Sequence, residues 1–190
     1  AVKWFRLSAE KGHPDAQYIL GLLYVKGQLI PQDYKKAVRL YRLSAEQGHA
    51  DAQFILGSMY QDGLGIPQDY KEVVKWWKLS TEQGHLKAQY NLGVLYSKGV
   101  EVPQDFKEAV RLYRLSAEQG YTSAQSNLGN MYYEGTGVLQ DYVSAHMWFN
   151  LSGSKGNKGA VKNRNIIEKQ MTPSQIEKAQ DMARNWKPKK

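Results

Sequence analysis

The sequence predicts an all-α protein, a right-handed α/α superhelical solenoid of helix-turn-helix repeats that are 36 residues long. The first observation is a fixed period on which glycines, leucines and tyrosines recur. The second is apolar spacing of helical periodicity inside each period, without strand-like alternation. A fixed period of about 20 to 50 residues is typical of stacked units that bury their apolar faces against neighbours. The recurring residues are Gly12, Gly48, Gly84, Gly120 and Gly156, then Leu20, Leu56, Leu92 and Leu128, then Tyr24, Tyr60, Tyr96 and Tyr132.

The period also predicts the domain organisation. Residues 1–8 align with residues 37–44, which lie inside a repeat, so we expect the chain to be part of a longer array. Any signal peptide would lie upstream, and the localisation is therefore not predicted. The expected parts are an array at 1–157, made of a half repeat at 1–12 and full repeats at 13–48, 49–84, 85–120 and 121–156, and a degenerate repeat helix with a basic capping helix and tail at 158–190.

Each repeat is expected to contain two helices. In the second full repeat, apolar spacing predicts helix A over residues 51–60, and Gly63 ends it. Helix B follows over residues 70–80, with Asp69 as its N-cap, and Gly84 closes the repeat in the left-handed conformation. The recurring Asp33, Asp69, Asp105 and Asp141 are predicted N-caps, not acid/base carboxylates.

The C-terminal segment departs from the repeat. Residues 160–171 are predicted to form one helix. Thr172 and Gln175 have the spacing of a capping box, with Pro173 at the first helical position, so a last helix is expected to end near Trp186. Its apolar face suits a cap on the open end of a solenoid.

Composition excludes several kinds of site. The chain contains no cysteine, so thiolate zinc sites and cysteine nucleophiles are excluded, and no apolar run approaches the roughly 18 residues that cross a bilayer. The net charge is +8, of which +7 lies from Lys155 onward, where the sequence has ten basic and three acidic residues. The array is therefore nearly neutral, and the basicity belongs to the C-terminal segment.

The recurring residues resemble the Sel1-like repeat, which is related to tetratricopeptide repeats. The pattern is Ala-Gln-Tyr/Phe-x-Leu-Gly-x-x-Tyr-x-x-Gly, then Pro-Gln-Asp-Tyr, then a helix that ends in Ser-Ala-Glu-Gln-Gly-His. The resemblance covers four full units and half a unit at the start, and the fifth unit is degenerate. It implies an adaptor that holds a protein partner, in bacteria often in signalling, cell-envelope or host-interaction settings, with no cofactor and no enzymatic activity.

The repeats differ from one another on one side of helix A. At 100° per residue, Ala16, Leu20 and Tyr24 share the recurring side, and the opposite side varies. The resemblance to tetratricopeptide arrays implies that this varying side lines a concave groove, where aromatic residues supply contact area. The aromatic ladder of Tyr18, Phe54 and Tyr90 could equally pack between repeats, and both roles stay open. The expected partner-binding residues are Tyr18, Leu22, Lys26, Phe54, Ser58, Gln61, Tyr90, Val94, Lys98, Ser126, Asn130 and Tyr133.

Two alternatives concern chemistry. Ser152 and Lys155 match the Ser-x-x-Lys pattern of penicillin-recognising enzymes, but the serine recurs in every unit, which indicates a packing or hydrogen-bonding role. The basic tail could contact nucleic acid or anionic lipid, although it lacks interleaved exposed aromatic residues. One histidine per repeat is too widely spaced for a shared metal, so His13, His49 and His85 are expected to be turn residues before helix A.

Overall fold

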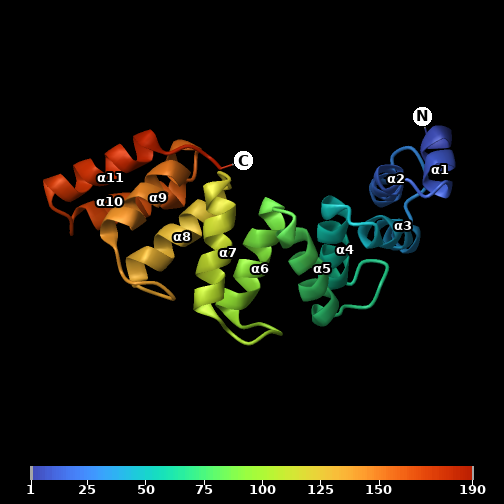
Figure 1. Ribbon diagram of the computed structural model, residues 1–190, viewed down its shortest axis with the longest axis horizontal. Helices are drawn as coiled ribbons and strands as arrows, with labels where there is room; N and C mark the ends of the chain where they lie inside the picture. Colours follow the sequence, from blue (N-terminus) through green and yellow to red (C-terminus); the bar gives the residue numbers. More distant parts are fainter. Residues whose placement is uncertain (1, 190) are drawn as a thin grey trace. The chain divides into compact units, whose positions relative to one another are not determined.

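The computed structural model describes residues 2–189, and within them the regular elements are eleven α-helices. The chain divides into two compact units, unit 1 at Ala1–Ala88 and unit 2 at Gln89–Lys190, and each is described by itself. No described helix is long and apolar enough to span a bilayer. The all-helical fold and the helix pairs of the predicted repeat are confirmed (Figure 1).

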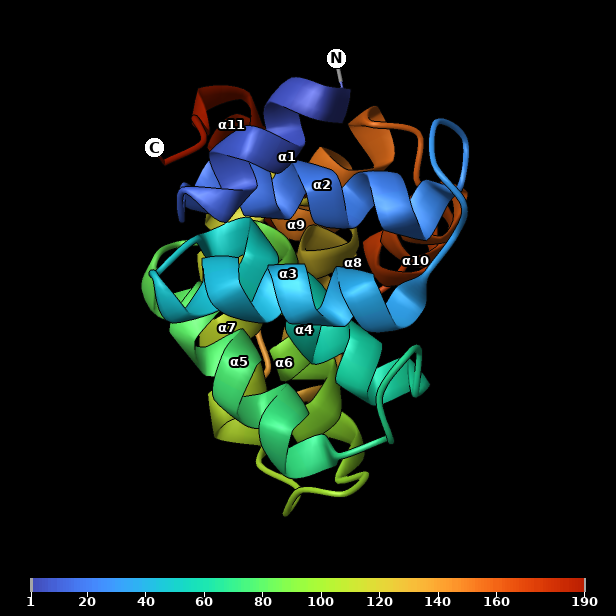
Figure 2. The same cartoon turned by 90° about the vertical axis from the view of Figure 1, so that its right-hand side faces the viewer.

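Unit 1 is a stack of antiparallel helix pairs. Figure 2 shows α1, α2 and α3 lying side by side in succession, and α4 and α5 form the next pair. The first helix of each full repeat is called helix A and the second helix B. The helices of unit 1 are α1 (Val2–Glu10), α2 (Pro14–Lys26), α3 (Tyr34–Glu46), α4 (Ala50–Asp62) and α5 (Tyr70–Glu82), and α6 (Leu86–Lys98) begins in this unit and continues in the next.

Unit 2 repeats the same arrangement and adds a C-terminal layer. Helices α8 and α9 pack as a pair, α7 packs on α8, and both α10 and α11 pack on α9. Trp186, just after the end of α11, lies edge-on to Trp148 of α9, with ring centroids 6.4 Å apart. The helices after α6 are α7 (Phe106–Glu118), α8 (Thr122–Glu134), α9 (Tyr142–Ser154), α10 (Lys158–Glu168) and α11 (Pro173–Asn185).

The helix ends follow the sequence signals. Asp33, Asp69, Asp105 and Asp141 each accept hydrogen bonds from backbone N–H groups in the first turn of a helix B. Helix A of the second full repeat ends at Gly63, which has a φ of +67° in the left-handed region. The capping box predicted at Thr172 and Gln175 is present at the start of α11. These predictions are confirmed.

Helix A and helix B of each repeat approach closely at a glycine. Gly57 of α4 lies against Trp77 of α5, and a Cβ built on Gly57 would come within 2.5 Å of the indole ring. The indole N–H donates to the Phe54 carbonyl oxygen at 3.0 Å, which fixes the ring in this position. The same pairing recurs as Gly21 with Tyr41, Gly93 with Tyr113 and Gly129 with Phe149.

Side-chain hydrogen bonds tie the end of helix B to the start of helix A. The buried Ser44 and Ser80 hydroxyls donate to the carbonyl oxygens of Pro14 and Ala50, at 2.9 and 2.8 Å. These carbonyls belong to the first turn of helix A in the same repeat. Ser152 makes the equivalent bond to the Thr122 carbonyl oxygen at 2.9 Å. The repeat-level role predicted for this serine is therefore confirmed.

Within each unit, a buried glutamine joins a repeat to the helix before it. Gln53 of α4 donates to the Ala45 carbonyl oxygen at the end of α3, at 3.1 Å, and accepts from Gln83 at 2.7 Å. In the last full repeat Gln125 keeps the first bond, to the Ala117 carbonyl oxygen at 3.2 Å. Its partner is replaced by Lys155, and the buried Oε1 of Gln125 has no hydrogen-bond partner.

We predict that Gly57→Ala destabilises the protein by about 1–2 kcal/mol. An alanine in a helix interior normally stabilises relative to glycine by about 0.5–1 kcal/mol, but here the new methyl group overlaps the Trp77 ring. The measurement is urea denaturation followed by circular dichroism. Ser58→Ala, at the next residue of the same helix, is the matched control and should change stability by less than about 0.5 kcal/mol. Equal stability of Gly57→Ala and wild type would contradict the close approach.

We also predict that Glu101→Gly stabilises the protein by up to about 1 kcal/mol. Glu101 has a φ of +60°, in the left-handed region, whereas the equivalent residues 36 positions away are glycines, Gly65 and Gly137. A side chain in this conformation is strained by about 1–2 kcal/mol, and the gain is reduced by the extra entropy of glycine in the unfolded chain. Denaturant melts of the two proteins compare them directly, and a loss of stability would be the contrary result.

Candidate protein-interaction surface

The candidate surface is the side of the A helices that varies between repeats, called here the A-helix face. In unit 1 it contains Tyr18, Leu22 and Lys26 of α2. Tyr18 and Leu22 are partly buried, and Lys26 is exposed. The opposite side of the same helix carries the buried Ala16 and Leu20. The repeated residues therefore form the core of unit 1, and the varying residues stay accessible.

The aromatic ladder takes part in packing between repeats. Tyr18 stacks on the imidazole of His49, with ring centroids 4.7 Å apart, and also lies 5.9 Å from the Tyr41 ring. Burial raises the pKa of Tyr18, and the carboxylate of Asp51 raises it further. Phe54 stacks in the same way on His85, at 4.7 Å. These rings remain half-buried, so their outer edges are still part of the face.

Each of His49 and His85 stacks on an aromatic ring, caps a helix A and contacts a carboxylate of the preceding repeat. The Nδ1 atom of His85 accepts the Ala88 backbone N–H at 3.1 Å and so caps helix α6. Because Nδ1 is an acceptor, the proton of the neutral ring lies on Nε2, which faces an Asp51 carboxylate oxygen at 3.1 Å. His49 makes the same contacts, to the Ala52 N–H and to Asp15 at 3.2 and 3.3 Å.

Sequence reasoning placed these histidines at a turn but missed their partners. The internal repeats contained a signal for them, because Asp15 precedes His49 and Asp51 precedes His85 by the same 34 residues. In the next unit both members change together, to Lys87 and Tyr121. Tyr121 then makes no side-chain cap bond at the start of α8.

The A-helix face of unit 2 has a different character. Tyr90 lies edge-on to Tyr121, with ring centroids 5.1 Å apart, and burial raises the pKa of Tyr90. Tyr133 packs beside Tyr142 of α9, at 5.8 Å between centroids. Asn130 accepts a hydrogen bond from Asn163 of α10 at 2.9 Å, so its side-chain oxygen already has a partner within the chain.

The remaining predicted residues are polar or small and lie at the accessible edge. Lys26 and Lys98 are exposed, and no carboxylate in residues 2–189 pairs with either of them. Gln61 and Ser58 are half-exposed, although the Ser58 hydroxyl donates to the Phe54 carbonyl oxygen. Leu22, Val94 and Ser126 are also half-buried.

The side chains considered for catalysis or metal binding make hydrogen bonds and ion pairs within the fold. Ser152 is buried and donates to the Thr122 carbonyl oxygen. Lys155 donates instead to the Gly120 carbonyl oxygen at 2.6 Å and lies over the Trp186 ring. His146, isolated in the sequence, is fully buried and pairs with Glu168 at 2.8 Å. Within the described residues no cluster of three His, Cys, Asp or Glu side chains is placed to hold a metal ion.

Comparisons with known proteins bear on the repeat and its fold. The family model for the Sel1 repeat matches residues 1–13, 14–49, 50–85, 86–121 and 122–157. A Sel1 repeat protein from Oxalobacter formigenes is 34% identical, with a TM-score of 0.80, over 85% of this chain and 47% of that one.

Two further structures resemble the chain. The protective antigen c5321 of uropathogenic Escherichia coli is 31% identical, with a TM-score of 0.60, over 97% of this chain and 48% of that one. The immunity protein Pa5087 of Pseudomonas aeruginosa, 23% identical with a TM-score of 0.52, covers 84% of this chain and 59% of its own, and shares the fold. The chain thus spans about half the length of the first two structures. No curated protein matches it significantly.

We predict that the stability of the protein falls as the pH is lowered from about 7.5 to about 5.5, in part through His85. Burial lowers the pKa of His85 below its ordinary value of 6.5, outweighing the Asp51 carboxylate, and Lys87 lowers it further. The unfolded chain therefore binds this proton at a higher pH than the folded chain does. The stabilisation is present above the ordinary pKa and is lost as the pH falls below it.

The variant His85→Asn tests this linkage, because asparagine also caps helices but does not titrate. Denaturant melts at several pH values should show a smaller loss of stability in this variant than in wild type. His13→Asn, at an exposed turn without a side-chain cap bond, is the matched control. An identical pH dependence in wild type and His85→Asn would exclude the role of His85.

Proposed function

Because the chain belongs to the Sel1 repeat family, whose members generally mediate protein–protein interaction, we propose that it is a non-catalytic scaffold that binds a partner protein along the A-helix face. The observation that carries the proposal is the division of each A helix. The recurring side supplies the core, and the varying side remains accessible. Side chains that lie outside the core can differ between repeats, and they can therefore be adapted to one partner.

The packing of the ladder refines this proposal. Tyr18 and Phe54 contribute their half-buried ring edges, because their faces are stacked on histidines. Leu22 in unit 1 and Val94 in unit 2 add apolar area, and the exposed Lys26 and Lys98 supply charge. Aromatic anchors would provide affinity, and the charges would set partner choice.

Two more specific functions would use this same surface. A bacterial regulatory adaptor and a protein that occludes an effector or toxin would both present the A-helix face to one protein. Hydrolysis through Ser152 is disfavoured, because its hydroxyl is buried and already donates to a backbone carbonyl. Nucleic-acid binding by the tail is disfavoured because Lys189 pairs with Glu118 within the chain.

A charge-reversal experiment tests the proposal. We predict that the double variant Lys26→Glu/Lys98→Glu loses a partner that wild type captures from the source organism, because both exposed ammonium groups lie on the A-helix face. The partner is identified by crosslinking and mass spectrometry, and its affinity is then measured with purified components. We expect a loss of about tenfold or more, which corresponds to about 1.4 kcal/mol.

The control is the double variant Lys35→Glu/Lys107→Glu, which changes the net charge equally. These exposed lysines lie in helices B and have the same spacing of 72 residues. The control should keep the partner. Equal loss in both variants, or retention in both, would place the interaction elsewhere and refute the proposal.

A further inference from the structure

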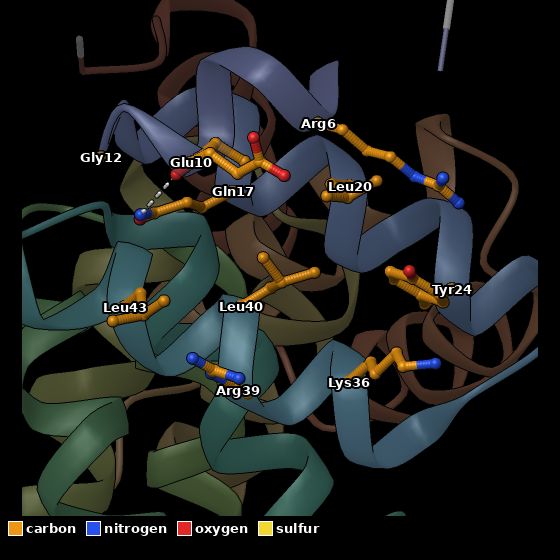
Figure 3. Close-up of a pocket in the computed structure, with 11 residues that line it drawn as sticks. Arg6, Glu10, Gly12, Gln17, Leu20, Tyr24, Lys36, Arg39, Leu40 and Leu43 are labelled. Atoms are coloured by element: carbon orange, nitrogen blue, oxygen red, sulfur yellow. Dashed lines mark hydrogen bonds between the residues drawn. The ribbon is translucent and has the colours of Figure 1, made fainter. Parts of the chain in front are cut away.

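A groove in unit 1 lies on the other side of α2 from Tyr18, Leu22 and Lys26 of the A-helix face. Its volume is about 880 Å³, and it runs between the B-type helices α1 and α3 with α2 as its floor (Figure 3). Leu20, Leu40 and Leu43 form an apolar strip along it. Glu10 lies near one end of this strip, and Arg6 and Lys36 lie near Tyr24 at the other.

The same groove exists in unit 2, where the chain's own C-terminal segment covers it. Eight of the eleven lining residues are identical 108 residues later, and the three that differ are Lys36, Arg39 and Leu40, which become Ser144, Met147 and Trp148. The identical pairs are Arg6 and Arg114, Ala9 and Ala117, Glu10 and Glu118, Gly12 and Gly120, Gln17 and Gln125, Leu20 and Leu128, Tyr24 and Tyr132, and Leu43 and Leu151.

The covering segment makes specific contacts in unit 2. The Trp186 ring lies against Trp148 and, with Pro188, close to Gly120. The backbone N–H of Lys189 donates to the Glu118 carbonyl oxygen at 2.8 Å, and its ammonium pairs with the Glu118 carboxylate at 2.8 Å. An aromatic ring followed three residues later by a lysine is therefore the ligand that this groove holds within the chain.

The course of α11 shows how a helix enters the groove. Gln175, near the start of α11, lines a small cavity together with Tyr142 at the start of α9. Trp186, after the end of α11, meets Trp148 farther along α9. Helix α11 therefore runs along α9 in the same direction and delivers its aromatic residue to the end of the groove where Glu118 lies.

The next groove along unit 1, between α3 and α5, is partly filled by its own side chains. Trp76 is buried there, donates to Glu72 at 2.8 Å and has the Lys75 ammonium 4.9 Å from its ring. Arg42 also crosses this groove and donates to the Tyr60 hydroxyl at 2.6 Å. In the groove between α1 and α3 the equivalent of Trp76 is the smaller Leu40.

We propose that the groove between α1 and α3 binds a partner protein's helix that ends in an aromatic residue and continues into an extended segment with a lysine. Glu10 would receive the lysine as Glu118 receives Lys189, and the leucine strip would receive the ring. This site is separate from the A-helix face and goes beyond the function proposed above.

The residues that differ between the two grooves define what the partner helix carries. Lys36 and Arg39 add positive charge beside the start of α3, where the first turns of the incoming helix would lie. In residues 2–189 Arg39 has no carboxylate partner, and Lys36 pairs only with Asp33 of its own helix cap. Acidic residues at the start of the partner helix would complement these cations and its own helix dipole.

The probe for this site is a fluorescently labelled synthetic peptide with the sequence of residues 172–189, added to the full chain. Fluorescence anisotropy should show saturable binding of one peptide per chain. Glu10→Lys should weaken the binding about tenfold, because it replaces the attractive charge with a repulsive one. Glu46→Lys changes the equivalent exposed residue beside the groove between α3 and α5 and should leave the affinity unchanged. A peptide with Trp186→Ala should bind about tenfold more weakly.

Further variants separate the possible outcomes. Leu43→Asp alters a side chain of the strip that is 40% exposed, and it should also weaken binding without unfolding the protein, as melting curves will show. Weakening by Glu118→Lys but not by Glu10→Lys would mean that the peptide exchanges with the chain's own tail, and this would overturn the proposal. Absence of saturable binding, or equal effects of Glu10→Lys and Glu46→Lys, would also overturn it. Lys26→Glu/Lys98→Glu should bind the peptide normally, so failure here is distinguishable from failure of the A-helix face.

Discussion

The contact between a helix A glycine and a helix B ring is the constraint on which the rest of each repeat depends. At Gly57 the absence of a Cβ lets the Trp77 ring lie directly on the backbone of α4. Because interiors are packed as densely as organic crystals, this spacing then decides which neighbouring side chains can be accommodated. It also brings the end of α5 to the start of α4, where Ser80 reaches the Ala50 carbonyl oxygen.

Buried polar side chains complete the connections that the rings begin. The hydroxyl of Ser80, the amide of Gln53 and the imidazole of His85 all bond to backbone groups at helix ends. A buried polar group without a partner is costly, so these bonds favour one register of stacking within a unit. The side of helix A that lacks such bonds is left to vary, and this freedom is the physical basis of the proposed partner surface.

The last full repeat differs from the others at Lys155. Lys155 replaces the glutamine that would serve Gln125, and it contacts Trp186 instead. One buried hydrogen bond is lost, and an aromatic contact with the C-terminal segment is gained. The groove between α7 and α9 is thereby covered by the chain itself, whereas the equivalent groove between α1 and α3 stays open.

The sequence by itself determined the helix pairs, their caps and the identity of the core side of each A helix. These properties are local or periodic: Asp69 caps the helix that follows it, and Leu56 recurs every 36 residues because every repeat buries the same position. It also indicated a structural role for Ser152, since a residue present in every unit serves the repeat.

The tertiary structure decided how residues of different repeats meet. The stacking of Tyr18 on His49, the pairing of His85 with Asp51 and the seat of Trp186 beside Trp148 all join residues more than 30 positions apart. Helical periodicity places a side chain on a face, but it contains no information on which ring lies opposite. That outcome depends on the distance between packed helices, which the glycine and ring of each repeat set in three dimensions.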